Sequence, residues 1–141
     1  MLQRDYFLRI IQEFMAALSA FMERRRDAAS RDRALRDLYR QYVGPYDTLA
    51  RLSTADTLHY AADQWSDTER IERLAMLAEL LYTEATYSQA PLSTMLYERA
   101  YQLYDYVETH GDTYSIDRHA KMAAIRQMQQ MAGGADGAES K

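Results

Sequence analysis

The chain contains no cysteine among its 141 residues, so disulfide bonds, thiolate metal sites and cysteine nucleophiles are all excluded. Glycine and proline are scarce, with five and two residues, and no segment alternates polar and apolar residues as a half-buried strand would. Alanine, leucine, methionine, glutamine, glutamate and arginine dominate instead, and these residue types favour helices. The composition therefore predicts an all-α protein with few turns.

Long apolar runs are missing as well. No stretch approaches the roughly twenty apolar residues that a transmembrane helix needs, and Arg9 and Glu13 interrupt the apolar core that a secretory signal would require. We therefore expect a cytoplasmic protein. The length suits one helical domain, which we place at residues 1–132, followed by a small, polar tail at residues 133–141 that we expect to be disordered.

The common signatures of enzymes and metal sites are also absent from the sequence. It has no G-x-S-x-G motif, phosphate-binding loop or glycine-rich dinucleotide turn. Its three histidines, His59, His110 and His119, stand outside any H-E-x-x-H or E-x-x-H arrangement, which would gather ligands on one helix face. We therefore expect no metal, no cofactor and no enzymatic activity. The alternative is a catalytic site assembled only in three dimensions.

Positive charge is in deficit overall and is unevenly distributed. The formal net charge of −4 argues against nucleic-acid binding, because that function depends on a concentrated positive surface. Residues 1–51 carry ten arginines and seven acidic residues, whereas residues 52–114 carry three arginines and eleven acidic residues. This asymmetry predicts two helical layers that face each other, within one chain or between two chains.

The first predicted helix, over residues 2–22, is strongly amphipathic. Its apolar residues recur at steps of three and four along one wide stripe: Phe7, Ile10, Ile11, Phe14, Met15, Leu18, Phe21 and Met22. So wide a stripe favours packing in the core of its own domain. Two alternatives stay open: pairing with a second copy in a homo-oligomer, and binding to a membrane surface, which the acidic residues of the helix disfavour.

Arg24-Arg25-Arg26 follows this helix and is the most basic run of the chain. Because acidic residues surround it, we interpret this run as a solvated hinge whose charges pair with one another. An anion-binding site is the less favoured alternative. Ser30 is the predicted N-cap of a second helix that ends at Gly44, although one continuous helix over residues 4–43 also fits the sequence. Short helical turns follow over residues 45–52.

Ser53 is then expected to cap a short helix with four inward residues: Leu58, Ala61, Ala62 and Trp65.

Residues 66–111 predict two helices joined by a short turn. The S-x-x-E spacing of Ser66 and Glu69 predicts a capping box at the first helix, and Gly111 predicts a left-handed stop after the second. The buried stripes comprise Ile71, Leu74, Leu77, Ala78 and Leu81 in the first helix and Leu96, Ala100, Leu103 and Val107 in the second. The opposite face of the first helix, which includes Glu79 and Glu84, is expected to face solvent.

This hairpin resembles a tetratricopeptide repeat. The residues that carry the likeness are Leu77, Ala78, Leu81, Ala85, Tyr97 and Ala100, with small side chains where the two helices approach. No second copy follows at a period of about 34 residues, so a generic antiparallel helix pair is the alternative. A last helix, capped by Ser115 and apolar along a face from Ile116 to Met131, is expected to cover the open side of the hairpin. We predict an antiparallel bundle of about five or six helices with one tetratricopeptide-like hairpin.

The opening segment Asp5-Tyr6-Phe7-Leu8-Arg9-Ile10-Ile11 resembles the start of an uncharacterised bacterial family of short helical proteins. The resemblance implies an amphipathic first helix, a leucine- and tyrosine-rich second helix that ends in glycine, a short S-x-x-D helix and a tetratricopeptide-like pair. Leu38 to Gly44, Ser53 to Asp56 and Leu77 to Leu81 follow that order, although the link between the hairpin helices is shorter here. The family has no assigned reaction, so the resemblance implies an architecture and no activity.

Tyrosine is abundant, with twelve residues, and Tyr97, Tyr101 and Tyr104 lie beside the buried stripe of the second hairpin helix. Aromatic side chains with a polar tip are common at recognition surfaces. We therefore name these three residues, with Arg70, as candidate partner-binding residues, and core packing of the tyrosines is the alternative. The predicted function is a non-enzymatic interaction or scaffold module for a protein or peptide partner. The alternative is a structural homo-oligomer assembled through the N-terminal helix.

Overall fold

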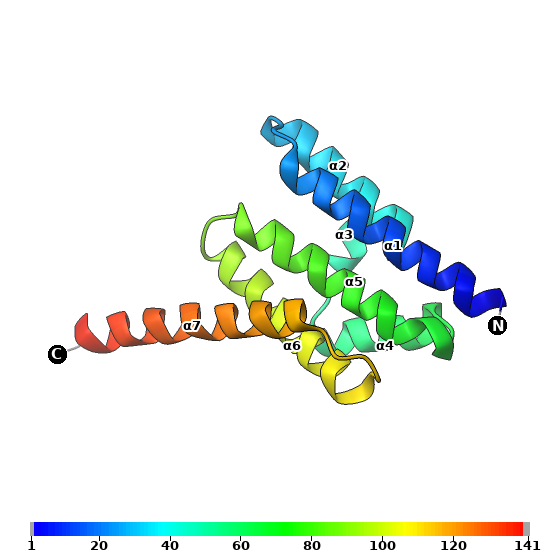
Figure 1. The fold of residues 1–141 in the computed structure, drawn as a ribbon. Helices are drawn as coiled ribbons and strands as arrows, with labels where there is room; N and C mark the ends of the chain where they lie inside the picture. The colour runs from blue at the N-terminus through cyan, green and yellow to red at the C-terminus, as the bar shows by residue number, and fades with distance from the viewer. Residues whose placement is uncertain (1, 140–141) are drawn as a thin grey trace.

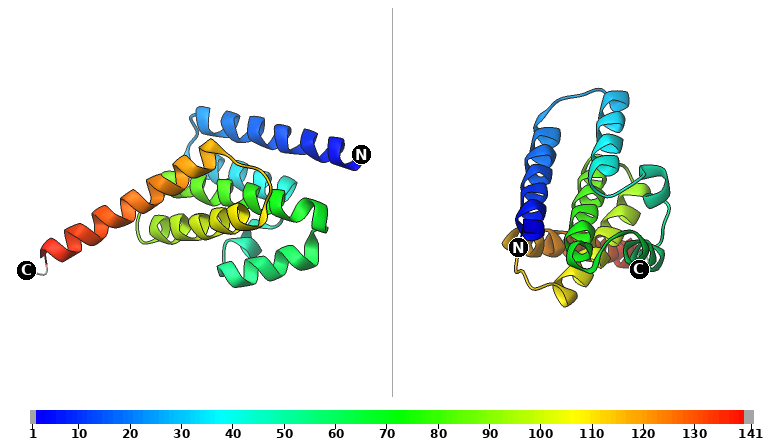
Figure 2. Two further views of the ribbon diagram at one scale, coloured as in Figure 1. Left: turned by 60° about the horizontal axis from the view of Figure 1, so that its bottom comes forward. Right: turned by 90° about the vertical axis from the view of Figure 1, so that its right-hand side faces the viewer.

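The computed structural model describes residues 2–139 and holds seven helices in that range (Figures 1 and 2). The helices are α1 (Leu2–Glu23), α2 (Ala28–Tyr42), α3 (Tyr46–Leu49), α4 (Thr54–Gln64), α5 (Asp67–Thr86), α6 (Leu92–His110) and α7 (Ile116–Glu139). No strand occurs among the described residues. The predicted all-α helical bundle is therefore confirmed. No described helix combines the length and the apolar character that crossing a membrane would need.

Helix α5 lies at the centre of the bundle. It contacts α1, α2, α4 and α6, and its contact with α6 is the most extensive in the chain. Figure 1 shows α5 and α6 running side by side in opposite directions, so the predicted antiparallel pair is confirmed. Ala78 and Ala100 are both fully buried, as expected of small residues at a close helix contact.

The prediction for the outer face of α5 is wrong. Glu79 and Glu84, which were expected to face solvent, are only 9% and 6% exposed. The physical reason is the central position of α5. Neighbouring helices cover α5 on several sides, so the position of a charged residue along it does not indicate exposure to solvent. Each glutamate therefore needs partners inside the protein.

Helix α1 packs on α2 and α5 and forms the outermost layer of the bundle in Figure 2. Phe7, Phe14, Leu18 and Phe21 are buried, which confirms the core-facing stripe. Met15 and Met22, which the sequence adds to that stripe, are instead 42% and 59% exposed. They lie on the flank of the stripe, which the neighbouring helices leave uncovered.

The helix ends correspond to most of the predicted boundaries, with local differences in how they are capped. The chain breaks after α1, and the carboxylate of Asp27, not Ser30, caps α2: Asp27 Oδ1 accepts a hydrogen bond from the Ser30 amide at 2.7 Å. Ser53 and Ser115 cap α4 and α7 as predicted. Ala62, expected to point inward on α4, is exposed.

Two further predicted caps differ in detail within the hairpin. Ser66 precedes α5 as predicted, but its hydroxyl contacts the Thr68 and Glu69 side chains and caps no backbone amide. Gly111 ends α6 with φ −95°, so its conformation is extended and not left-handed. Among the described residues a positive φ occurs at Gly44, at +145°, where a side chain would also collide with the Tyr60 hydroxyl.

Helix α7 crosses the α5–α6 pair and then projects beyond the bundle (Figure 1). Among the described side chains of α7, Arg118 and Ile125 are buried and Met122 is partly buried against the core, whereas Ile116 and Met131 are 78% and 69% exposed. The predicted apolar face is therefore confirmed at Met122 and Ile125 and wrong at its two ends. The helix continues to Glu139, through most of the stretch for which the sequence predicts a disordered tail, and residues 140–141 lie outside the described part of the chain.

Candidate functional site

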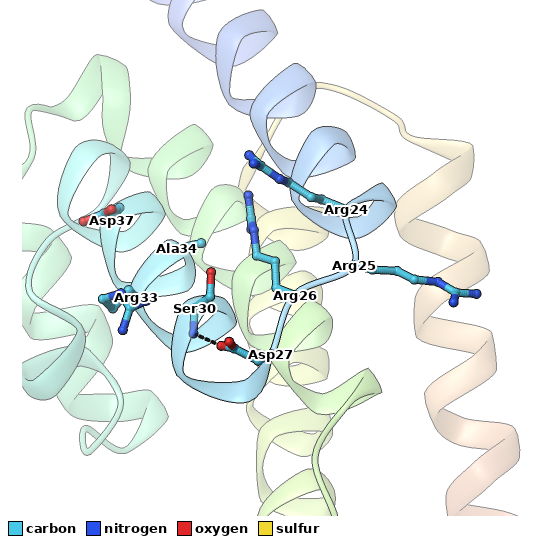
Figure 3. Close-up of a pocket in the computed structure, with 8 residues that line it drawn as sticks. All are labelled: Arg24, Arg25, Arg26, Asp27, Ser30, Arg33, Ala34 and Asp37. Atoms are coloured by element: carbon cyan, nitrogen blue, oxygen red, sulfur yellow. Dashed lines mark hydrogen bonds between the residues drawn. The ribbon is translucent and has the colours of Figure 1, made fainter.

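The turn between α1 and α2 gathers positive charge at one end of the bundle. Helix α1 ends at Glu23, three arginines follow, and Asp27 opens α2. Because α2 begins at once, arginines of its first turns join those of the turn. We call this set the arginine hinge: Arg24, Arg25, Arg26, Arg31 and Arg33. In Figure 3 the Arg24 and Arg26 side chains extend toward each other on one side of the turn, and Arg25 points away.

Three carboxylates near the hinge are committed elsewhere, and the exposed Glu23 pairs with none of its arginines. Asp27 caps the Ser30 amide, Asp32 pairs with Arg36 at 3.1 Å, and Asp37 pairs with Arg40. No arginine of the hinge forms an ion pair with a carboxylate in the described part of the chain. The interpretation of this segment as a hinge of mutually paired charges is therefore wrong, because helix capping and other ion pairs occupy Asp27, Asp32 and Asp37, and Glu23 forms no ion pair with the hinge.

Aromatic rings hold two of the hinge arginines in place. The Arg31 guanidinium lies 3.9 Å from the centre of the Tyr87 ring, and that of Arg26 lies 5.3 Å from the centre of the Phe21 ring. Arg26 Nη1 is buried without a hydrogen-bond partner. Stacking on a ring orients a guanidinium while leaving its N–H groups able to bind an anion.

Two shallow cavities of about 490 Å³ each border the hinge. Figure 3 shows the first, which Arg24 to Asp27 share with the start of α2, including Ser30 and Arg33. The second lies against α5 and is lined by Phe21, Met22, Thr83, Thr86 and Tyr87 together with four of the hinge arginines. The hinge therefore offers permanent positive charge, forked N–H donors and a nearby apolar wall, which suits carboxylate or phosphate groups on a partner.

The predicted partner-binding tyrosines lie in a different place, on the side of α6 that faces α7. Tyr104 is fully buried, with the Tyr82 ring 6.4 Å away between centres. Tyr97 is half-buried, also against Tyr82, and the Tyr101 ring is covered by the guanidinium of Arg126, 3.6 Å from its centre. Helix α7 thus occupies much of the face that the sequence suggested for a partner.

Arg70, the fourth predicted residue, is used inside the protein. Its guanidinium donates to the carbonyl oxygens of Ala61, Ala62 and Trp65, at the C-terminal end of α4, over 3.1 to 3.4 Å. It also pairs with Asp67 at 2.9 Å. The structure therefore does not bring Arg70 together with the tyrosines.

Two other arginines act in the same way as Arg70. Arg73 Nη1 donates to the Tyr42 carbonyl at the end of α2, at 2.7 Å. Arg99 donates to the carbonyls of Leu49 and Ala50 at the end of α3, at 2.7 and 2.8 Å. Carbonyl groups at a helix C-terminus lack partners within the helix and carry partial negative charge, so a guanidinium satisfies both needs. Three arginines of the hairpin thus form hydrogen bonds with the C-terminal carbonyl groups of three surrounding helices.

A second surface feature lies at the opposite end of α1. A groove of about 560 Å³ runs between the start of α1, the start of α5 and the loop after α6. Its apolar wall includes Phe7, Leu8, Ile11 and Ile71. Its acidic side chains are Asp67, Glu72 and Asp112, and we call it the acidic groove. One end of α1 is therefore basic and the other end adjoins acidic side chains.

Sequence reasoning missed a buried polar cluster around Glu84. The Tyr46 hydroxyl donates to Glu84 Oε2 at 2.7 Å, whereas Glu84 Oε1 and the hydroxyls of Tyr39 and Tyr87 are buried without a partner. Burial raises the pKa of the Glu84 carboxyl above its ordinary value, against the opposing effects of the Tyr46 hydrogen bond and the Arg99 charge. None of the three cavities described above is lined by Glu84.

The histidines serve local contacts. His110 Nδ1 lies 3.0 Å from the Tyr106 carbonyl oxygen, and His119 Nε2 lies 2.7 Å from Glu108 Oε2. The described residues contain no group of three His, Asp or Glu side chains placed to hold a metal ion.

Comparison with known proteins adds no relative. No family model, no curated protein and no solved structure matches the chain. The family resemblance of the opening segment therefore stays a prediction.

Proposed function

We propose that the chain is a non-enzymatic protein-interaction module that binds an acidic segment of a partner protein at the arginine hinge. The observation that carries the proposal is the gathering of five arginines that form no ion pair within the described residues. Guanidinium groups pair with carboxylates through parallel hydrogen bonds, and fixed geometry gives such pairs specificity as well as strength.

A protein partner fits this surface better than a nucleic acid does. The chain carries a net charge of −4, and residues 52–114 hold eleven acidic residues against three arginines, so a long polyanion that extends beyond the hinge would meet repulsion from the rest of the molecule. The cavity between the hinge and α5 also presents Phe21, Met22 and Tyr87. Apolar and aromatic side chains beside arginines suit a peptide that alternates acidic and apolar residues.

The tetratricopeptide-like character of the hairpin stays part of this proposal as a scaffold. Fully buried Ala78 and Ala100 support it, and the three arginine contacts to helix ends make α5 and α6 a rigid support for the outer layer. A cytoplasmic setting, which the sequence predicts, is compatible with this role.

The proposal is tested by fluorescence anisotropy with a labelled peptide of alternating aspartate and leucine. Replacing two exposed hinge residues in the variant Arg24→Gln, Arg25→Gln should weaken binding by about tenfold or more, the equivalent of one charge-assisted hydrogen bond. Arg40→Gln is the matched control, because Arg40 lies on α2 and its side chain is 77% exposed but is paired with Asp37. Equal affinity of the double variant and the wild type, or tighter binding of labelled single-stranded DNA than of the peptide, would refute the proposal.

The homo-oligomer is the second candidate function, and one observation favours it. The predicted interface residues Phe7, Phe14, Leu18 and Phe21 are buried in the chain's own core. Helix α1 nevertheless exposes Leu8, Met15 and Met22, so it retains an apolar surface that a second copy would cover.

A further inference from the structure

Three of the exposed apolar residues of α1 form a regular line, and exposed Tyr6 lies outside it. Leu8, Met15 and Met22 are 47%, 42% and 59% exposed and follow one another at seven-residue intervals. Residues seven apart in a helix lie on nearly the same side, so the three side chains form a single stripe along most of α1. Ile11 lies between Leu8 and Met15 in the sequence, is partly buried, and packs against the core beside this stripe. Methionine adapts its shape to a partner surface, which suits such a stripe for association.

The two ends of the stripe carry opposite charge. Met22 lies beside the arginine hinge and lines a cavity with it, whereas Leu8 lines the acidic groove with Asp67, Glu72 and Asp112. Within the described residues no ion pair joins residues 1–51 to residues 52–114. The charge asymmetry of the sequence is therefore not satisfied by ion pairs between these segments.

We propose that two copies of the chain associate through antiparallel α1 helices, so that the arginine hinge of each copy meets the acidic groove of the other. The proposal rests on the proposed function, since it assigns a partner to the same arginine hinge. With Met15 at the twofold axis, Leu8 of one copy lies opposite Met22 of the other, and the hinge falls beside Asp5 and the groove. The arrangement is closed and self-complementary, as twofold dimers require.

The size of the contact sets the expected strength. A helix of 22 residues is roughly 33 Å long, and one helix pair buries less than the about 800 Å² per partner that is usual in stable complexes. The apolar stripe alone is therefore too small, and the two charged ends contribute both affinity and orientation. We expect a weak, concentration-dependent dimer that weakens as salt is added.

Sedimentation velocity of the full chain over a range of concentrations tests the dimer. Met15→Glu places two like charges across the twofold axis and should raise the dimer dissociation constant by about tenfold or more. Met131→Glu is the matched control, because Met131 is 69% exposed on α7 and should leave the constant unchanged. A wild-type chain that stays monomeric at the highest soluble concentration overturns the proposal, and so does a Met15→Glu variant that dimerises normally.

A charge exchange tests the pairing of hinge and groove. The variant Arg24→Glu, Arg25→Glu and the variant Glu72→Lys, Asp112→Lys should each be monomeric alone, because like charges then face each other at both ends. Mixed together they should form a heterodimer, since each altered surface meets its complement. Circular dichroism and thermal melting of each variant establish that it is folded. Failure of the mixture to associate overturns the assigned pairing.

The outcomes separate this inference from the proposed function. A dimer that forms while the acidic peptide fails to bind refutes the foreign acidic partner and supports the second copy as the partner of the hinge. Peptide binding by a chain that remains monomeric supports the proposed function and overturns the dimer.

Discussion

Replacement of Glu84 by glutamine should stabilise the protein at neutral pH. Glu84 is 6% exposed, one of its carboxylate oxygens accepts the Tyr46 hydroxyl at 2.7 Å, and the other oxygen has no partner. Glutamine is almost the same size and its carbonyl can keep the Tyr46 hydrogen bond, and the substitution removes a negative charge from a buried side chain whose second oxygen has no partner. A buried group without a partner costs more when it is charged than when it is neutral, so loss of the charge should stabilise the fold by about 1 kcal/mol.

The gain should depend on pH in a defined direction. Burial raises the pKa of Glu84 in the folded chain above its unfolded value. Its stabilising contribution is therefore complete below the unfolded pKa of about 4.3 and is lost as the pH rises through the folded pKa. The difference in unfolding free energy between Glu84→Gln and the wild type should consequently be smallest near the unfolded pKa, grow with pH and then level off.

Urea denaturation of both proteins across this pH range measures the difference directly. Glu79→Gln is the matched control on the same helix, because Glu79 is similarly buried but pairs with Lys121. The control should be destabilised at neutral pH by about 1 kcal/mol, the difference between a charged and a neutral hydrogen bond. If Glu84→Gln is less stable than the wild type, or if the difference does not change with pH, Glu84 is ionised and well paired and the reasoning fails.

Two further predictions concern packing, and both are checked by urea denaturation. Phe14→Ala should lower the unfolding free energy by about 3 to 5 kcal/mol, because Phe14 is fully buried and packs edge-on against Tyr42 with ring centres 5.1 Å apart; an unchanged midpoint would show that α1 contributes little to the core. Ala100→Leu should cost about 1 to 3 kcal/mol by overpacking the α5–α6 contact, and a variant as stable as the wild type would contradict close packing at that position.

Most of the fold was predictable because it follows from periodic apolar residues and capping residues. The stripe of Leu96, Ala100, Leu103 and Val107 is buried as a unit, and Ser53 and Ser115 cap helices where their positions indicate. Such signals are local, since a hydrogen bond to an amide three residues away needs no tertiary structure.

The errors arise where tertiary contacts override the local pattern. Glu79 and Glu84 were assigned to solvent because a surface helix has a wet side, and the central position of α5 removes that side. On α7, Arg118 is buried and Ile116 exposed, since Arg118 pairs with Glu108 of α6 and also donates to the Thr113 carbonyl. No periodicity in the sequence reveals contacts of this kind.

The candidate site was harder to predict than the fold, for a related reason. The run Arg24 to Arg26 was visible in the sequence, but whether its charges were paired depended on the position of the helix boundary. Once Asp27 caps α2, its carboxylate is directed at the Ser30 amide. Asp32, one turn further on, is held by Arg36. A shift of three residues in the predicted cap was therefore enough to reverse the interpretation of the hinge.

The same residue type has different roles in the two parts of the chain, and hydrogen bonding to carbonyl groups distinguishes them. Arg70, Arg73 and Arg99 come from the hairpin, and each reaches the carbonyl groups at the end of a neighbouring helix. The hairpin arginines thereby neutralise helix ends and stabilise the bundle. The side chains of the hinge arginines form no ion pair and donate to no helix-end carbonyl within the described residues, so their N–H groups stay able to bind another molecule. Exposed charges contribute little to the stability of a fold, so we expect the hinge arginines to act in association, in which they meet carboxylates of another molecule.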